Sequence, residues 1–246
     1  MKLCHIVGIG TAIPDDLTVS CLNTIRRSDV IISHISQHAI NDIFELVPRK
    51  PVISLRTEYQ DNRLRTSSYD AMFSKLLKHI SDYEMPCYLT YGTPFFYDSL
   101  SVKLAQYLVS RELPYTVTAG VSSFDHIFSL LRRDVVPHIE VLDADWIVSG
   151  HVTLDATRAL LIMQPSVFGT RYSRRDSAPT TDALEPLASS LKSAFDETHP
   201  VCFVHAATSD QDRSITHWCT VDTISSAPSY VLRSACLYVP PSSRDK

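Results

Sequence analysis

Glycine is scarce in this chain, and the positions of its glycines constrain the fold more than any other feature of the sequence. Average usage is about 7%, yet only six glycines occur in 246 residues. Four of the six sit at the C-terminal ends of three apolar runs, in the segments VGIGTAIP, TYGTPFF and TAGVSSF. Ligands of open parallel α/β sheets bind at the carboxyl ends of the strands. Three glycine turns at one such edge therefore predict one ligand site.

The second of these segments, LTYGTPFFY from Leu89 to Tyr97, ends an apolar run abruptly. Pro94 fixes its own φ and lacks an N–H donor, whereas Gly92 lets other backbone approach closely. The two phenylalanines that follow offer flat apolar faces that suit an aromatic ring or a methyl group. We interpret the segment as the floor of a pocket. An ordinary strand-to-helix turn beside a core aromatic cluster is the alternative.

Apolar strands and amphipathic helices alternate along the first half of the chain, which predicts an α/β fold with a parallel sheet. Asp15 or Asp16 is expected to cap the helix that follows the first strand. The G-x-G turn between them lacks the third glycine of a dinucleotide-binding loop, so it is a weak phosphate-binding signal. The strands are predicted at Leu3–Ile9, Val30–Ser33, Pro51–Leu55 and Tyr115–Ala119, and a later helix at Ser99–Ser110.

A chain of 246 residues suits either one large domain or two smaller ones. We place a first domain at residues 1–121 and a second at residues 122–246. Strand-like segments at 201–205, 214–224 and 230–239 follow one another closely in the second domain. Its sheet is therefore predicted to be partly antiparallel.

Composition excludes several classes of partner. A formal net charge of -4 gives no electrostatic reason to expect nucleic acid or an anionic membrane surface, and no apolar run approaches the ~20 residues of a membrane span. The six cysteines contain no C-x-x-C pair, which favours reduced thiols in a cytoplasmic protein. None of the ten histidines shows H-E-x-x-H spacing, so we expect no metal. A small molecule or another protein is the expected partner.

The polar segment RTEYQDNRLRTSSY, from Arg56 to Tyr69, carries the densest set of candidate catalytic groups. Tyr59, Arg63, Arg65 and Tyr69 are the candidates. A guanidinium beside a phenol lowers the pKa of the phenol, which then serves as a base or as part of an oxyanion clamp. In the alternative interpretation these side chains are solvated or pair with neighbouring carboxylates on the surface.

Three segments in this order, VGIGTAIPDDLTVSCLNTIRRSDVI, YGTPFFY and AGVSSF, resemble the tetrapyrrole methylase superfamily of S-adenosylmethionine-dependent methyltransferases. The resemblance implies two α/β domains with the cofactor in the cleft between them. Within the superfamily, Tyr59 to Tyr69 is similar to a segment of the borosin peptide backbone N-methyltransferases. That segment has a tyrosine, an arginine six positions on, and a tyrosine four beyond that. The similarity continues through ALLIMQ to the closing LYVPP.

The borosin resemblance implies a chemistry for the residues of the polar segment. A peptide N–H is a very weak acid, so its methylation needs help in removing the proton and in stabilising the imidate oxygen. Tyr69 or Tyr59, made more acidic by Arg65, supplies the first function, and Arg65 with a phenol supplies the second. Which tyrosine does which stays open. The sulfonium donor is already activated, so no metal is required.

The resemblance also implies a set of residues that bind the cofactor, S-adenosylmethionine. The residues are Tyr91, Thr93, Phe96, Ser99 and Gln164, and, from weaker similarity, His205, Ala206, Ala235 and Cys236. Borosin enzymes usually carry a histidine at the position of Thr93, a small residue at Phe95 and a proline at Ala119. These departures are expected to reshape the pocket or to weaken cofactor binding.

The resemblance further implies partners. Fused borosin proteins carry their own substrate peptide at the C-terminus, whereas this sequence ends directly after its last predicted strand. We therefore expect a separate ribosomal precursor peptide as substrate, as in split borosin systems, and a homodimer. Two alternatives stay open. One is another methyltransferase of the superfamily that acts on a tetrapyrrole or similar small acceptor, and the other is a non-catalytic scaffold that binds the cofactor or a peptide.

Overall fold

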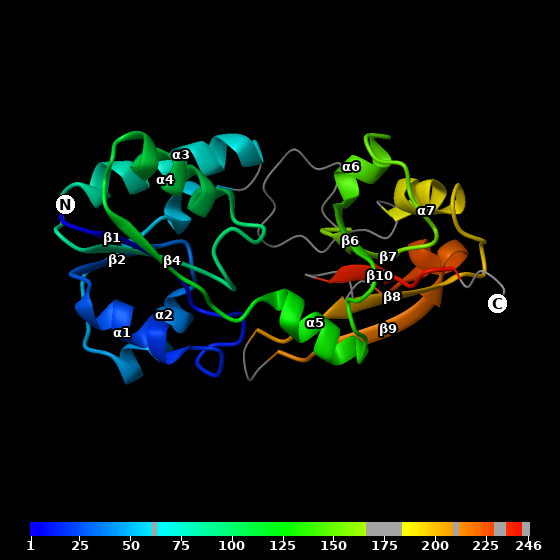
Figure 1. The fold of residues 1–246 in the computed structure, drawn as a ribbon, viewed down its shortest axis with the longest axis horizontal. Coiled ribbons are helices and arrows are strands. Elements are labelled where there is room, and N and C mark those ends of the chain that lie inside the picture. The colour runs from blue at the N-terminus through cyan, green and yellow to red at the C-terminus, as the bar shows by residue number, and fades with distance from the viewer. Residues whose placement is uncertain (61–62, 166–183, 209–211, 229–234, 243–246) are drawn as a thin grey trace. The chain divides into compact units, whose positions relative to one another are not determined.

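The computed structural model describes residues 1–60, 63–165, 184–208, 212–228 and 235–242 (Figure 1). It divides into two compact units, of which the first contains Met1–Asp125 and the second most of the chain from His126 onward. Each unit has one five-stranded sheet flanked by helices. This arrangement confirms the predicted α/β class with two α/β domains.

The sheet of the first unit is entirely parallel, in the order β3-β2-β4-β1-β5. Its central strands are fully buried, which explains why they read as unbroken apolar runs in the sequence. The predicted strands are confirmed and differ only at their ends. The strands are β1 (Cys4–Gly8), β2 (Val30–Ser33), β3 (Val52–Ser54), β4 (Pro86–Thr90) and β5 (Tyr115–Thr118).

Helices cover both faces of this sheet, α1 and α2 on one face and α3 and α4 on the other (Figure 1). Successive strand residues point to opposite faces, so Val7 packs with α1 and α2 whereas Ile6 packs with α3 and α4. The helices are α1 (Val19–Arg27), α2 (Gln37–Leu46), α3 (Arg65–Ile80) and α4 (Ser99–Ser110), with a short 3-10 helix, η1 (Arg56–Glu58), before α3.

The expected cap of the first helix is wrong. Thr18, not Asp15 or Asp16, is the N-cap of α1. The Asp16 carboxylate instead turns back into the glycine turn, where its Oδ2 accepts hydrogen bonds from the backbone N–H groups of Thr11 and Ala12, both at 2.8 Å. The turn leaves these donors without a strand partner, so a buried carboxylate that pairs with them outweighs the helix-capping preference.

The sheet of the second unit is mixed, in the order β6-β7-β10-β8-β9. Only the β6–β7 pair is parallel, and β10 runs antiparallel to both β7 and β8, which confirms the partly antiparallel prediction. The strands are β6 (Ile139–Asp143), β7 (Ala159–Met163), β8 (Pro200–His205), β9 (Ile215–Thr220) and β10 (Cys236–Val239). The helices are α6 (Ala144–Val148), α7 (Glu185–Lys192) and the 3-10 helix η3 (Val221–Ser226), together with α5 (Ser123–Leu131), whose first three residues belong to the first unit.

One predicted strand of this unit is too long. The segment 214–224 forms β9 only as far as Thr220, where η3 begins with Thr220 and Thr223 in a reciprocal capping box. Such a box favours a helical start over continued strand. Part of another predicted strand, residues 230–234, lies outside the described residues.

Candidate functional site

The three glycine turns meet at the carboxyl edge of the first sheet. Strands β4, β1 and β5 are neighbours there, so Gly92, Gly8 and Gly120 follow one another across the edge. A Cβ added at Gly120 would lie 2.2 Å from the Gly92 carbonyl oxygen, and one added at Gly8 would lie 2.5 Å from the same oxygen. These neighbours are backbone atoms that cannot move aside. The predicted convergence of the turns is confirmed, and it depends on glycine.

The innermost backbone groups of this edge are bonded to one another. Gly10 N–H donates to the Gly92 carbonyl at 3.0 Å, and Gly92 N–H donates to the Gly10 carbonyl at 2.7 Å. Both glycines have positive φ, 81° and 62°. Since their N–H groups are already paired, they cannot form the row of free donors that cradles a phosphate. A cofactor without phosphates fits this turn better.

The loop between β4 and α4 combines backbone strain with exposed aromatic rings. Phe95 and Tyr97 have φ of 69° and 59°, in the left-handed region that favours glycine, and they are 47% and 46% exposed. The Phe96 ring packs edge to face on Phe124 with 5.9 Å between centroids. Left-handed non-glycine residues are costly and cluster at functional sites. Glycine would adopt this φ at position 95 without strain, whereas this chain carries phenylalanine there.

Four of the predicted cofactor residues lie on this same stretch, from Tyr91 to Ser99. The Tyr91 hydroxyl accepts a hydrogen bond from the backbone N–H of Ser36 at 3.0 Å, so it supports the start of α2. Thr93 is partly exposed, and its carbonyl accepts from Phe96 N–H at 3.4 Å. Ser99 is exposed at the first residue of α4. Thr93, Phe96 and Ser99 therefore remain suited to contact a ligand, whereas the Tyr91 hydroxyl already accepts a hydrogen bond from α2 and offers a ligand mainly its own proton.

The other predicted cofactor residues gather at one edge of the second sheet. Because β10 runs antiparallel to β7 and β8, its start lies beside the ends of those two strands. The Cys236 thiol lies 3.5 Å from the Met163 sulfur across this edge. The five residues there are Gln164, His205, Ala206, Ala235 and Cys236.

These five residues differ in what they offer a ligand. The His205 Nε2 lies 2.8 Å from an Asp212 carboxylate oxygen, so its most polar atom is already paired. Burial raises the pKa of the Cys236 thiol to about 12, which leaves it an inert apolar group. Gln164 has a φ of 53° directly after β7. The predicted cofactor residues thus form one group in each unit, and the cleft between the domains stays a prediction.

The three predicted catalytic residues come together within the first unit. Tyr59 ends η1, Arg65 begins α3, and Tyr69 follows one helical turn later. The two phenol rings meet edge to face, with centroids 6.4 Å apart and planes at 90°. Within the described part of the chain, neither phenol hydroxyl has a hydrogen-bond partner. The described side chains thus leave both hydroxyls as candidates to contact an acceptor.

The electrostatics of Tyr69 differ from the sequence-based expectation. Burial raises the pKa of the Tyr69 phenol, and Tyr59 adds to this rise, whereas the charge of Arg65 lowers it. The Arg65 effect has the predicted sign, but burial outweighs it, so the prediction of a more acidic phenol is wrong in its net direction. Tyr69 keeps its proton at neutral pH and is a hydroxyl donor there.

A partly buried polar network around Tyr88 acts on Tyr69, and the sequence alone does not predict it. The Tyr88 hydroxyl lies 3.2 Å from the His34 Nδ1 and donates to the Asp98 carboxylate at 3.4 Å. Asp98 also caps α4 by accepting from Leu100 N–H at 3.0 Å, and its charge raises the pKa of Tyr69. Asp98 directly before a predicted helix was the one sequence signal, a capping signature. Nothing in the spacing linked it to the tyrosines.

Two features are absent from the described residues. No cluster of three or more histidine, cysteine or acidic side chains there is placed to hold a metal ion. No helix in the same residues combines the length and apolarity that crossing a membrane requires.

Comparison with known proteins places these features in a family. Residues 3–222 match the family model of Tetrapyrrole (Corrin/Porphyrin) Methylases. The structure resembles the methyltransferase CobJ (TM-score 0.66, 10% identity, covering 100% of this chain and 97% of that one). It also resembles uroporphyrin-III-C-methyltransferase from Thermus thermophilus (0.68, 13%, 97% and 92%). A comparison with curated proteins gave no match.

A second structure of the Thermus thermophilus enzyme, solved in complex with S-adenosyl homocysteine, has a TM-score of 0.62 at 14% identity and covers 96% of this chain and 91% of that one. At such identities the likeness establishes the fold, and the family match extends over most of the sequence. Tetrapyrrole methylases use S-adenosylmethionine as methyl donor. The chain therefore belongs to the tetrapyrrole methylase family of S-adenosylmethionine-dependent methyltransferases.

Proposed function

We propose that the protein methylates backbone amide nitrogens of a peptide. The observation that carries this proposal is the edge-to-face contact of Tyr59 and Tyr69, with the charge of Arg65 acting on Tyr69. Amide nitrogen is a poor nucleophile until its proton leaves and the negative charge moves to the carbonyl oxygen. Two phenols and a guanidinium are the groups that such a step needs, and no metal is required.

Each of these side chains has a separate role in the proposed methyl transfer. Bound S-adenosylmethionine supplies an activated methyl group. Tyr69 is protonated at neutral pH because burial raises its pKa, so its hydroxyl donates to the acceptor carbonyl as that oxygen gains charge. Arg65 offsets the same charge. Tyr59, at the end of η1, is then the candidate to take the amide proton, which it does in its ionised tyrosinate form and thereby returns to the neutral phenol.

For the cofactor, we propose the two groups of residues at the edges of the two sheets. In the first unit, Thr93, Phe96 and Ser99 combine hydroxyls with an aromatic ring on one loop. In the second, Gln164 is the polar candidate at the end of β7. We further propose a separate precursor peptide as acceptor, a homodimer and a cytoplasmic location, as expected from the sequence.

A second candidate function is methylation of a tetrapyrrole or similar small acceptor. Uroporphyrin-III-C-methyltransferase, one of the structural neighbours, carries such an acceptor in its name. Within this chain, Arg56, Arg63 and Arg65 lie close together in sequence and suit the carboxylates of such a molecule. A non-catalytic scaffold is the third candidate, since Phe95 departs from the borosin pattern.

One experiment separates these candidates. The purified protein is incubated with S-adenosylmethionine and, in parallel, with a pool of synthetic peptides or with uroporphyrinogen III. Mass spectrometry with fragmentation then locates any added methyl group. Backbone N-methyl groups that disappear in Arg65→Ala and Tyr69→Phe are the expected result. Methylation of uroporphyrinogen III alone selects the second candidate, and no methylation despite calorimetric binding of the cofactor selects the third.

A further inference from the structure

We propose that Lys75 is a positioning residue that holds Tyr59 against Tyr69 through Thr57 and Glu58. The inference rests on the proposed function in so far as the tyrosine pair acts in methyl transfer. Lys75 lies on α3, the helix that carries Tyr69, whereas Thr57 and Glu58 belong to η1, which Tyr59 terminates. The clamp formed by Lys75, Thr57 and Glu58 therefore joins the two elements that carry the phenols.

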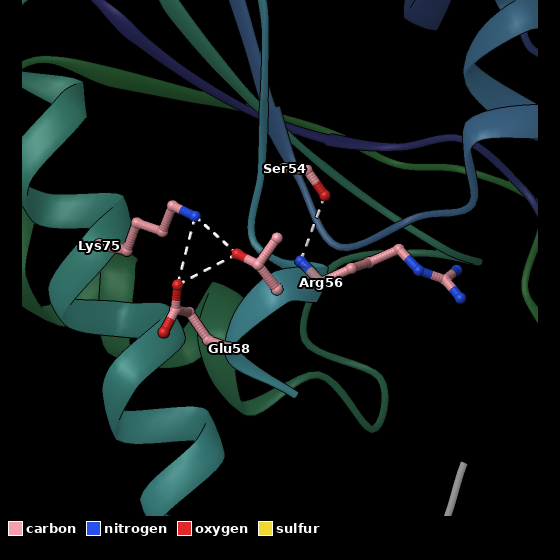
Figure 2. Close-up of polar contacts among 5 residues, drawn as sticks. Ser54, Arg56, Glu58 and Lys75 are labelled. Atoms are coloured by element: carbon pink, nitrogen blue, oxygen red, sulfur yellow. Dashed lines mark hydrogen bonds and ion pairs between the residues drawn. The ribbon is translucent and has the colours of Figure 1, made fainter. Parts of the chain in front are cut away.

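The clamp is a closed triangle of polar contacts (Figure 2). The Lys75 ammonium donates to the Thr57 hydroxyl at 2.7 Å and to a Glu58 carboxylate oxygen at 3.2 Å. The Thr57 hydroxyl in turn donates to the same Glu58 oxygen at 3.1 Å. Figure 2 shows the Arg56 side chain directed away from this triangle. Each of the three groups is held by both others, which fixes η1 in register with α3.

η1 has little to hold it in place by itself. It contains three residues, and Tyr59 directly after it donates its N–H to the Arg56 carbonyl at 3.1 Å. At its start, Arg56 N–H donates to the Ser54 hydroxyl oxygen at 3.3 Å (Figure 2). A 3-10 turn of this length is not stable alone. Leu55, fully buried before the turn, anchors one end. Tyr59 itself packs against the core of the first unit, and the clamp anchors the two residues directly before it, so we infer that the clamp sets the angle at which the Tyr59 ring meets Tyr69.

The clamp is better shielded than ordinary surface ion pairs. The side chains of Lys75 and Glu58 are 27% and 28% exposed. The hydrogen bond from Lys75 lowers the pKa of Glu58, so the carboxylate stays ionised at neutral pH. On the same helix, the pair Lys103–Asp70 joins α3 to α4 at 2.7 Å but is 39% and 67% exposed. That pair does not touch η1, so it provides a matched control.

The test compares Lys75→Met with Lys103→Met, each of which removes one ion pair from α3. 3-Fluorotyrosine is incorporated at position 59, and its fluorine NMR resonance reports the surroundings of the ring without any need for activity. We expect Lys75→Met to shift or broaden this resonance and to lower kcat on a methylated peptide about tenfold, with KM for S-adenosylmethionine unchanged. Lys75→Arg, which keeps the charge and the donors, restores both, and Lys103→Met changes neither.

The outcomes separate the clamp from the proposed function. An unchanged resonance and an unchanged kcat in Lys75→Met overturn the inference, and so does an equal effect of Lys103→Met. If the wild-type protein methylates no peptide but the resonance moves only in Lys75→Met, the clamp stands and the proposed function fails. If Lys75→Met does not fold, Glu58→Gln takes its place, and an unmoved resonance in that variant overturns the inference equally.

Discussion

His5 and Thr116 face each other from the neighbouring strands β1 and β5, with the His5 Nδ1 2.7 Å from the Thr116 hydroxyl. The other ring nitrogen, Nε2, is buried and has no partner among the residues that the structure describes. His5 as a whole is 5% exposed. A buried imidazole with one unpaired nitrogen is tolerated as the neutral form, because the charged form would lose its hydration without compensation.

This relationship predicts that the protein loses stability in mild acid. Burial lowers the pKa of His5, the charge of Arg27 lowers it further, and that of Asp29 opposes them. A depressed folded-state pKa means that the stability is fully present above the unfolded value of about 6.5 and is lost as the pH falls toward the folded value. His5→Phe keeps the ring shape without titrating, so its urea midpoint should fall less than that of the wild type below pH 6.5.

The comparison of the two proteins cancels the contributions of the other histidines. Above pH 7 the variant should be as stable as the wild type or more stable, because Thr116 is exposed and keeps water as a partner. Parallel acid profiles of the two proteins would show that His5 does not carry the effect.

The close packing of Gly8, Gly92 and Gly120 predicts that two alanine substitutions lower the free energy of unfolding by different amounts. Gly120→Ala places a Cβ against backbone atoms at 2.2 and 2.7 Å, whereas a Cβ at Gly92 meets nothing closer than 3.7 Å. Gly92 has a positive φ, so Gly92→Ala costs about 1–2 kcal/mol. Gly120→Ala should cost at least about 3 kcal/mol, because backbone cannot relax as a side chain does. Urea unfolding of both variants checks the order, and equal losses would contradict the geometry.

Asp16 and its neighbour Asp15 are predicted to differ in how much each contributes to the free energy of unfolding. The Asp16 carboxylate accepts from Thr11 N–H, Thr11 hydroxyl and Ala12 N–H, and the residue is 8% exposed, whereas Asp15 is exposed. Asp16→Ala leaves these donors unpaired and should lower the free energy of unfolding by about 3 kcal/mol. Asp15→Ala should change it by less than about 0.5 kcal/mol. Thermal and urea unfolding of the two variants would detect a reversed order.

Much of the first unit was predictable because its signals are local. Buried parallel strands appear in a sequence as unbroken apolar runs, and one such run predicts β2 with its observed bounds, Val30–Ser33. The helical period of the apolar residues from Ser99 to Ser110 likewise predicts α4 with its observed bounds. Because glycine is scarce in this chain, the positions of its glycines predict that Gly8, Gly92 and Gly120 approach one another closely. The first two inferences needed only neighbours along the chain, and the third needed in addition the rule that ligands of parallel sheets bind where the strands end at one edge.

The remaining features depend on distances that the sequence does not contain. An aspartate such as Asp16 can serve either as the N-cap of a helix or as an acceptor for N–H groups of a loop, and only the path of the glycine turn decides between these two roles. The net pKa shift of Tyr69 is the sum of burial and several charges, of which only Arg65 is near in sequence. Lys75 meets Thr57 and Glu58 across a gap of 18 and 17 residues, so no helical spacing links them.

The electrostatics of Tyr69 lead to the prediction that decides its role. Arg65→Met removes the charge that lowers the pKa of Tyr69, so the phenol should ionise at higher pH than in the wild type, already above the ordinary value of about 10. The ultraviolet absorbance of tyrosinate measures this directly, with Tyr69→Phe in each background to isolate the signal. Arg65→Lys, which keeps a positive charge, should fall between the two.

The pH dependence of methylation then distinguishes two uses of the same phenol. If Tyr69 donates its hydroxyl to the acceptor oxygen, kcat falls as the pH rises through the pKa of Tyr69, and that limb moves to higher pH in Arg65→Met. If Tyr69 is the base, kcat rises over the same range, and the rise is delayed in the variant. Burial raises the pKa of Tyr69, so we expect the first pattern. Because Tyr59 as the base adds a rising limb of its own, only a rising limb that moves in Arg65→Met would make Tyr69 the base and transfer the role of donor to Tyr59.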